Sequence, residues 1–397
     1  MSRALYFGLP LEGHVNPSLG LVQELVRYGE EIIYYSGDEY KEKILKSGAE
    51  FRSLGFIKSK QDKRDISSHL NPLERENRLL HYIIKVMPTI LNQVKEDNVD
   101  YIIFDTQFVL GKMIAHQLSL PSVSFCTTFA FSKKKVDQKR KRLTNYKLNS
   151  ALVEEQNRLR QNLSNEYGFA MPDSIMFTTG DITLVCTSKY FQPESGDFDK
   201  TFKFIGPSIT DRNDTSDFPI AALKGSRTIF ISMGTIVNEQ PELYSSCLKA
   251  FADMDILVVM SIGKKVNIQY FGNIPSNFII RNYVPQLQVL QNTDVFITHC
   301  GMNSTSEALY YGVPLVMNPI GSDQPMVAER VNMLGAGIIL DKSEINVEGL
   351  RKAVETILSD PGFVKNASKI GESLRSTGGY RKGVEEIISF KKSKGGC

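Results

Sequence analysis

The chain has 397 residues, of which 42% are hydrophobic and 23% are charged, and its formal net charge is +3. This composition is typical of a soluble globular protein, and the length fits two domains of about 200 residues each. The nearly neutral charge argues against nucleic acid as a partner, and no stretch approaches the roughly 18 consecutive apolar residues of a membrane span, which excludes stable membrane insertion.

The N-terminus and the cysteines indicate a cytoplasmic protein. The first residues carry one basic side chain and a short apolar run that ends before Glu12 and His14, unlike a secretory signal. The five cysteines have no CxxC spacing, so they are expected to be reduced thiols, not disulfide partners or zinc ligands.

The first half of the chain alternates apolar runs with segments of helical spacing. Strands are predicted at 3–9, 32–36, 101–104 and 122–125, and helices at 17–29, 38–47 and 111–118. This alternation implies a parallel sheet that helices cover on both faces and that binds ligands at the carboxyl ends of its strands.

A second series of the same kind follows a polar segment with Gly and Pro, 207–225, which we interpret as a linker. Its strands are predicted at 228–232, 256–260, 278–281, 295–298, 314–317 and 336–340, with helices at 241–251 and from about Asn303. The sequence therefore predicts two facing, doubly wound, Rossmann-like α/β domains with a cleft between them, at 1–206 and 226–378. Residues 379–397 are expected to form a C-terminal helix and tail that can pack back on the N-terminal domain.

A basic run at 133–142, KKKVDQKRKR, has two interpretations. It is either the solvated face of a helix or a segment attracted to an anionic lipid surface. The run has no apolar face beside it, which favours the solvated helix.

The most informative polar residues follow the strand predicted at 295–298. His299 and Gly301 lie in a turn, and Asn303 and Ser304, which are favoured N-cap types, are expected to begin the next helix. A helix N-terminus with small hydroxyl groups and a nearby imidazole is suited to bind a diphosphate. Glu307, one turn further on, can accept hydrogen bonds from a ribose diol.

Ordinary helix capping explains Asn303 and Ser304, but it does not explain Glu307, Asp323 and Gln324 as well. A second anion-binding element is the strand end ISMGT at 231–235. Gly234 lets the backbone approach a ligand closely, and the Thr235 hydroxyl can donate to a phosphate oxygen.

His14 follows the first predicted strand, and Asp105 ends the strand at 101–104. A neutral imidazole can take a proton from a hydroxyl group, and a carboxylate on its other nitrogen fixes the tautomer. An aspartate at a strand end is otherwise often a cap. The loop GLPLEGHVNP lacks GxGxxG, which argues against nicotinamide binding, and no DxD pair indicates metal-dependent transfer, so no metal site is predicted.

The stretch from Tyr283 to Gln324 resembles the nucleotide-binding box of the UDP-glycosyltransferase superfamily, and the N-terminal half resembles its bacterial, Bacillus-type macrolide glycosyltransferase branch. The resemblance covers nearly the whole chain and implies the GT-B fold, with an N-terminal acceptor-binding domain and a C-terminal domain for the nucleotide sugar. The resemblance implies no prosthetic group. It implies that the nucleotide-sugar donor is bound by Gly234, Thr235, Tyr283, Val284, Gln286, His299, Gly301, Asn303, Ser304, Glu307, Asp323 and Gln324. Tyr283 stands where plant members usually have a tryptophan stacked on uracil, a contact that a tyrosine makes with less area.

The resemblance further implies an inverting transfer of glucose from UDP-glucose to a hydroxyl of an apolar small molecule, such as a flavonoid or a macrolide. His14 would be the general base, oriented by Asp105. The acceptor pocket is expected to include Gln107, Phe108, Thr127, Thr128 and Phe129. A monomer or weak dimer is expected.

Two other functions use the same architecture: a nucleotide-sugar epimerase and a UDP-sugar-binding protein that has lost transfer. The presence of both His14 and Asp105 argues against the inactive protein. An epimerase needs no acceptor, so it would convert UDP-glucose incubated alone.

Overall fold

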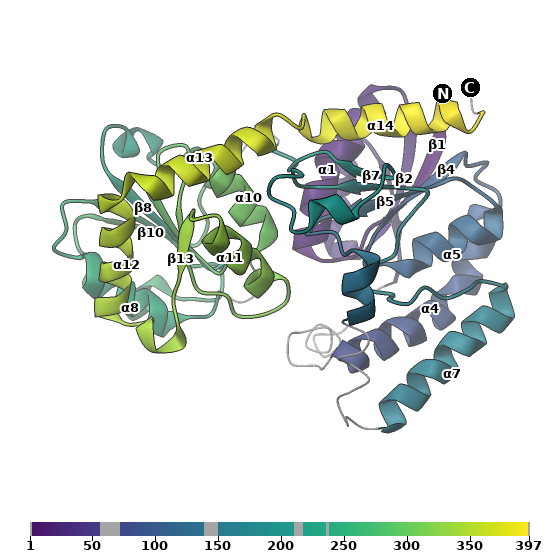
Figure 1. Cartoon of the computed structure of the whole chain (residues 1–397), viewed down its shortest axis with the longest axis horizontal. Helices are drawn as coiled ribbons and strands as arrows, with labels where there is room; N and C mark the ends of the chain where they lie inside the picture. Colours follow the sequence, from purple (N-terminus) through teal and green to yellow (C-terminus); the bar gives the residue numbers. More distant parts are fainter. Residues whose placement is uncertain (1, 56–71, 139–149, 210–216, 236–237, 396–397) are drawn as a thin grey trace. The chain divides into compact units, whose positions relative to one another are not determined.

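The structure is a computed structural model that describes residues 2–55, 72–138, 150–209, 217–235 and 238–395 (Figure 1). The chain divides into two compact units, each built on one parallel sheet. Unit 1 comprises Met1–Ser188, Glu194–Ser208 and Thr377–Cys397, and unit 2 comprises Lys189–Pro193 and Ile209–Ser376. Two parallel α/β units confirm the predicted fold class.

Unit 1 contains a seven-stranded sheet in the order β3-β2-β1-β4-β5-β6-β7. Its strands are β1 (Arg3–Phe7), β2 (Glu31–Ser36), β3 (Glu50–Ser53), β4 (Tyr101–Asp105), β5 (Ser122–Cys126), β6 (Ile182–Val185) and β7 (Phe202–Phe204). The larger helices are α1 (Glu12–Arg27), α2 (Lys41–Lys46), α4 (Pro72–Val94), α5 (Val109–Leu118), α7 (Ser150–Tyr167) and α14 (Gly379–Ser393).

Helices cover both faces of this sheet because its strands carry apolar residues on both sides. Leu5 and Phe7 pack with side chains of α4, α5 and α7, whereas Ala4 and Tyr6 pack with those of α1 and α14. Figure 1 shows these two groups of helices on opposite sides of the strands of unit 1. Each face therefore has its own hydrophobic core.

Unit 2 contains a six-stranded sheet in the order β10-β9-β8-β11-β12-β13. Its strands are β8 (Thr228–Ser232), β9 (Leu257–Ser261), β10 (Phe278–Arg281), β11 (Val295–Thr298), β12 (Leu315–Met317) and β13 (Gly337–Ile339). The helices are α8 (Pro241–Phe251), α9 (Gln286–Leu290), α10 (Met302–Tyr310), α11 (Gln324–Met333), α12 (Val347–Ser359) and α13 (Pro361–Arg375). The described residues include no helix with both the length and the apolar character needed to cross a bilayer.

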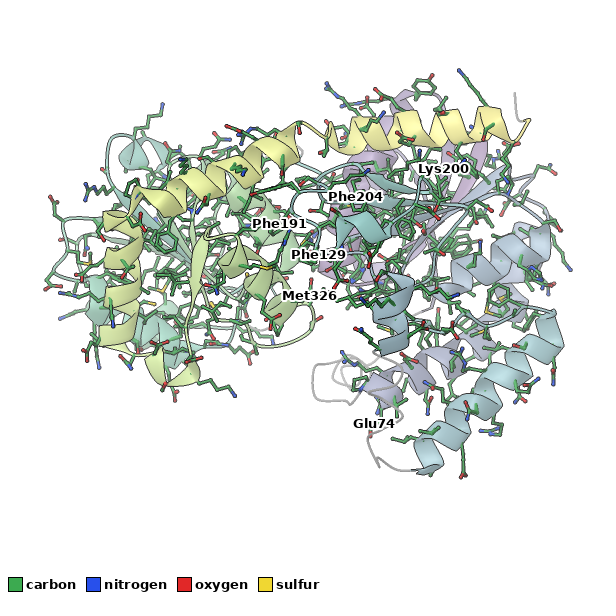
Figure 2. The ribbon with its side chains drawn as sticks, viewed as in Figure 1. Glu74, Phe129, Phe191, Lys200, Phe204 and Met326 are labelled. Carbon is green, nitrogen blue, oxygen red and sulfur yellow. The ribbon has the colours of Figure 1, made fainter. Side chains whose placement is uncertain are left out.

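A short segment from the first half of the chain, Lys189–Pro193, groups with unit 2. The Arg330 guanidinium of α11 donates to the backbone carbonyls of Phe191 at 2.9 Å and of Tyr190 at 2.6 Å. Phe191, labelled in Figure 2, is fully buried. The chain thus enters unit 2 briefly before it returns to complete the sheet of unit 1.

The sequence placed the first helix too late. We expected it to begin at Pro17, a residue that favours the first turn of a helix, but α1 begins at Glu12. The Leu11 carbonyl accepts hydrogen bonds from the N–H groups of His14 and Val15 at 2.9 Å, which starts the helix earlier. Of the basic run at 133–142, residues 133–138 are helical and 139–142 lie outside the described residues.

The last helix, α14, is held on unit 1 by a buried ion pair. The Lys391 ammonium lies 2.7 Å from the Glu30 carboxylate, and their side chains are only 11% and 6% exposed. Tyr101 donates to the same carboxylate at 3.0 Å. Val384 and Ile387 of α14 are buried in the core that α1 shares.

Lys391→Met should lower the free energy of unfolding of unit 1 by about 3–5 kcal/mol, because it leaves the Glu30 carboxylate buried without its counter-charge. Lys382→Met on the same helix is the matched control. The Lys382 side chain is 43% exposed where it pairs with Glu385 and Glu386, so its loss should cost less than about 1 kcal/mol. Urea unfolding followed by circular dichroism measures both, and equal losses would contradict this role of Lys391.

Candidate active site

In unit 1 the predicted catalytic residues lie together where the strand order reverses. Strands β1 and β4 are neighbours, with Phe7 paired to Phe104, although β2 and β3 separate them in the chain. The carboxyl ends of two such strands form the usual binding crevice of an open α/β sheet. His14 follows β1, in the first turn of α1, and Asp105 is the last residue of β4.

His14 and Asp105 form a close pair. His14 Nδ1 lies 2.7 Å from Asp105 Oδ2, and the two side chains are 13% and 2% exposed. The other carboxylate oxygen accepts the Gln107 backbone N–H at 2.8 Å, so both oxygens are held in place. If Nδ1 carries the proton that is shared with the carboxylate, the neutral ring has a lone pair on Nε2, which is the form that a general base requires.

The five residues expected to bind the acceptor are placed differently from one another. Thr127 follows β5, and its hydroxyl lies 3.2 Å from His14 Nδ1. Thr128 is buried and accepts a hydrogen bond from the Cys126 thiol through its carbonyl. Phe108 and Phe129 are fully buried; Phe129 is labelled in Figure 2, and Phe108 lies in the core beneath α5.

Of these five residues, Thr127 contacts the imidazole of His14 through its hydroxyl, and Gln107 contacts Asp105 through its backbone N–H. Phe108 belongs to the core that α4 and α5 share. The loop after β5 also contains Phe131, which the sequence analysis did not single out. Its ring packs edge-on against that of Phe177, with 5.5 Å between the ring centroids. Aromatic residues that follow a strand end could have signalled this pair.

Unit 2 repeats the arrangement at its own reversal of strand order. Strands β8 and β11 are neighbours, with Ser232 paired to Thr298. Gly234 and Thr235 follow β8, and His299 follows β11. The predicted phosphate-binding residues of these two motifs are therefore brought to adjacent strand ends.

Two glycines enclose the His299 ring. A Cβ at Gly234 would lie 2.5 Å from His299 Cε1, and a Cβ at Gly301 would lie 2.6 Å from His299 Nε2. Gly234 also has a φ of +75°, which favours glycine. Neither position can therefore hold a side chain while the imidazole keeps its place.

Burial lowers the pKa of His299 from 6.5 to about 4, although the Asp323 carboxylate and a hydrogen bond to the Ser232 backbone act in the opposite direction. The ring is therefore neutral near pH 7. A neutral imidazole can still donate one hydrogen bond to an anion, and it does so without bringing a full positive charge into the site.

The start of α10 differs from the expectation, which gave the cap to Asn303 or Ser304. The helix begins at Met302, and Gly301 is its N-cap, with no side-chain cap. Any side chain at Gly301 would strike His299, which explains why the cap is a glycine. Asn303 and Ser304 instead occupy the first turn of α10, at the positive end of the helix, which favours an anion.

Gln286, at the start of α9, links two residues of α10 that are predicted to bind the nucleotide sugar. Its amide donates to Glu307 Oε2 at 2.6 Å and to Ser304 Oγ at 3.3 Å. Glu307 is only 4% exposed. A buried carboxylate held by an amide is a well-positioned acceptor for hydroxyl groups.

The other residues that are predicted to bind the nucleotide sugar lie in neighbouring loops of unit 2. Tyr283 is 58% exposed, so its ring is accessible to solvent, whereas Val284 is buried. Gln324 Oε1 accepts backbone N–H groups at 2.8 and 3.1 Å, which leaves its amide nitrogen to donate. Asp323 is the N-cap residue of α11 and lies close enough to His299 to affect its pKa.

No group of three or more His, Cys, Asp or Glu side chains suited to a metal ion occurs in the part of the chain that the structure describes.

Comparison with known proteins identifies the family of the chain. Residues 221–374 match the family described as "UDP-glucoronosyl and UDP-glucosyl transferase". The UDP-glucosyltransferase YojK of Bacillus subtilis is 36% identical over 99% of this chain and 98% of its own length. The NDP-glycosyltransferase YjiC of the same species is 32% identical, over 97% and 96%.

Among solved structures, the calicheamicin glycosyltransferase CalG4 superposes with a TM-score of 0.85 at 27% identity and covers 99% of this chain and 98% of that one. These similarities confirm the expected superfamily, its Bacillus-type branch and the GT-B fold.

The lowered pKa of His299 should make unit 2 less stable as the pH falls. The unfolded chain takes up this proton near pH 6.5 and the folded chain only near pH 4, so the unfolded state binds more protons between these values. From pH 7 to about pH 4.5 the unmodified protein should lose about 2–3 kcal/mol of unfolding free energy more than His299→Gln does. Urea unfolding at both pH values tests this, and the same pH dependence in both proteins would contradict the buried neutral imidazole.

Proposed function

Because the chain belongs to the UDP-glucosyltransferase family, we propose that it transfers glucose from UDP-glucose to a hydroxyl group of an apolar small molecule, with inversion at the anomeric carbon. The observation that carries this proposal is the 2.7 Å pair of His14 Nδ1 and Asp105 Oδ2 at the carboxyl ends of β1 and β4. A protein that only bound the nucleotide sugar would have no use for a positioned base.

In the proposed reaction the acceptor oxygen attacks C1 of α-linked UDP-glucose and His14 Nε2 takes the hydroxyl proton. The new C1–O bond forms as the bond from C1 to the phosphate oxygen breaks, so the sugar inverts and UDP leaves. Asp105 stabilises the imidazolium that forms and keeps the ring in its reactive tautomer. Such a base contributes about 10² to 10⁴-fold to the rate.

On the donor side, the leaving diphosphate is met by the N-terminus of α10, the His299 ring and the Thr235 hydroxyl. The Glu307 carboxylate accepts from the ribose hydroxyls, next to the Gln286 amide that already holds it. Tyr283 stacks on the uracil ring, and the backbone of Val284 binds the base. For the sugar, Asp323 accepts and Gln324 donates, since the Gln324 oxygen is already occupied.

The acceptor is proposed to be an aromatic or macrocyclic natural product with a free hydroxyl. The Thr127 hydroxyl lies 3.2 Å from His14 Nδ1, and the loop after β5 continues with Phe129 and Phe131. Apolar walls distinguish poorly between similar shapes. We therefore expect several phenols and macrolides to be accepted.

Two histidine variants separate the jobs of the two units. His14→Ala should lower transfer by about 10² to 10⁴-fold while UDP binds nearly as before, because it removes only the base. His299→Ala removes a donor to the phosphates, so it should weaken UDP binding as well as slow transfer.

Steady-state rates and calorimetric titration with UDP measure the two effects. A phenol ionises near pH 10, so His14→Ala should lose less activity toward phenols at high pH than toward aliphatic alcohols. The proposed division of roles is wrong if His14→Ala transfers to alcohols at the unmodified rate, or if it loses UDP binding as His299→Ala does.

A further inference from the structure

Asn238 is a buried amide of unit 2 to which neither the sequence motifs nor the proposed mechanism assign a role. It lies beyond β8, four residues after Gly234, and is 5% exposed. Its Nδ2 donates to the Gly234 carbonyl at 3.0 Å. Its Oδ1 is buried and accepts no hydrogen bond within the described residues. A buried amide oxygen without a hydrogen bond is uncommon in native proteins and calls for an explanation.

The surroundings of Asn238 fix it firmly. Its backbone carbonyl accepts from the Tyr244 hydroxyl at 3.1 Å and from the Gln240 N–H at 2.9 Å. Its side chain packs over Gly263 after β9, where a Cβ would lie 2.0 Å from Asn238 Nδ2. Gly263 therefore leaves the space that the amide fills. The result is a rigid hydrogen-bond donor aimed at one backbone carbonyl.

That carbonyl belongs to the peptide group between Gly234 and Thr235. The peptide is trans, so its C=O and N–H point in opposite directions. When Asn238 holds the carbonyl, the Thr235 N–H must point away from Asn238. The other side of Gly234 is also held, since its N–H donates to Ser232 Oγ at 3.4 Å and its Cα lies against the His299 ring.

We propose that Asn238 is a positioning residue that orients the Gly234–Thr235 peptide so that its N–H binds the diphosphate of a nucleoside diphosphate. This inference rests on the proposed function, because it takes the loop after β8 to be part of the donor site. A preorganised N–H group stabilises an anion without the cost of reorienting when the ligand arrives. Asn238 itself does not touch the ligand.

The test compares UDP with uridine, which lacks the diphosphate, by calorimetric titration of the full chain. Asn238→Ala should weaken UDP binding about tenfold, the effect of losing one hydrogen bond to a charged group, and should leave uridine binding unchanged. Asn238→Asp keeps the shape of the side chain but sets a carboxylate against the Gly234 carbonyl. It should weaken UDP binding at least as much and serves as the second variant if the alanine protein is unstable.

Asn366 offers a matched control in the same unit. Its Nδ2 donates to the Gly335 carbonyl at 3.1 Å, and Gly335 also has a positive φ, but this contact precedes β13 at the amino end of the sheet. Asn366→Ala should leave the affinities for UDP and uridine unchanged. Melting temperatures of all variants report any general loss of stability.

Equal weakening of UDP and uridine by Asn238→Ala would show a merely structural role and overturn the inference, as would unchanged UDP binding. Both results presuppose that the unmodified protein binds UDP. Failure of the unmodified protein to bind UDP would instead overturn the proposed function, so the two failures are distinguishable.

Discussion

The chemistry of this protein depends on a constraint of parallel sheets. A strand that starts a sheet acquires neighbours on both sides, and the connections to them leave on opposite faces, so the loops at that point diverge. In unit 1 the point lies between β1 and β4, and in unit 2 between β8 and β11. His14 and Asp105, and likewise Thr235 and His299, each end or follow one of these four strands.

Within unit 2 this constraint is refined by close packing around one imidazole. Gly234 and Gly301 approach His299 so closely that any side chain would displace it. The same packing removes water from the ring and lowers its pKa to about 4. It also makes a glycine, which has no side chain to cap the helix, the N-cap of α10. Close packing around His299 thus explains both the neutral imidazole and the glycine cap of α10.

Much of this could be predicted from the sequence, because strand ends and polar residues are local patterns. The alternation of strands and helices predicted the two sheets, and the placement of His14 and Asp105 at strand ends predicted that they could meet. Local patterns failed where the first residue of a helix depends on a contact that residue spacing does not show. The start of α1 depends on the Leu11 carbonyl, and the cap of α10 depends on the His299 ring.

The hydrogen bond from Gln286 to Glu307 joins α9 to α10. The hydrogen bond from Arg330 to the Phe191 carbonyl joins α11 to the segment Lys189–Pro193. No periodicity in the chain signals either one. Asn238 shows the same limit, since an asparagine after a strand reads as an ordinary loop residue until its amide is seen to hold the Gly234 carbonyl. These hydrogen bonds depend on the folded backbone, so only the structure reveals them.

The proposed reaction is a single displacement at the anomeric carbon, assisted by a base. Its most direct test is the anomeric configuration of the product formed from α-linked UDP-glucose and a simple phenol, read from the proton coupling at C1 by NMR after mass spectrometry has identified the hexose adduct. Inversion at C1 should give the β-glucoside alone. An α-glucoside, or release of free glucose with no adduct, would contradict it.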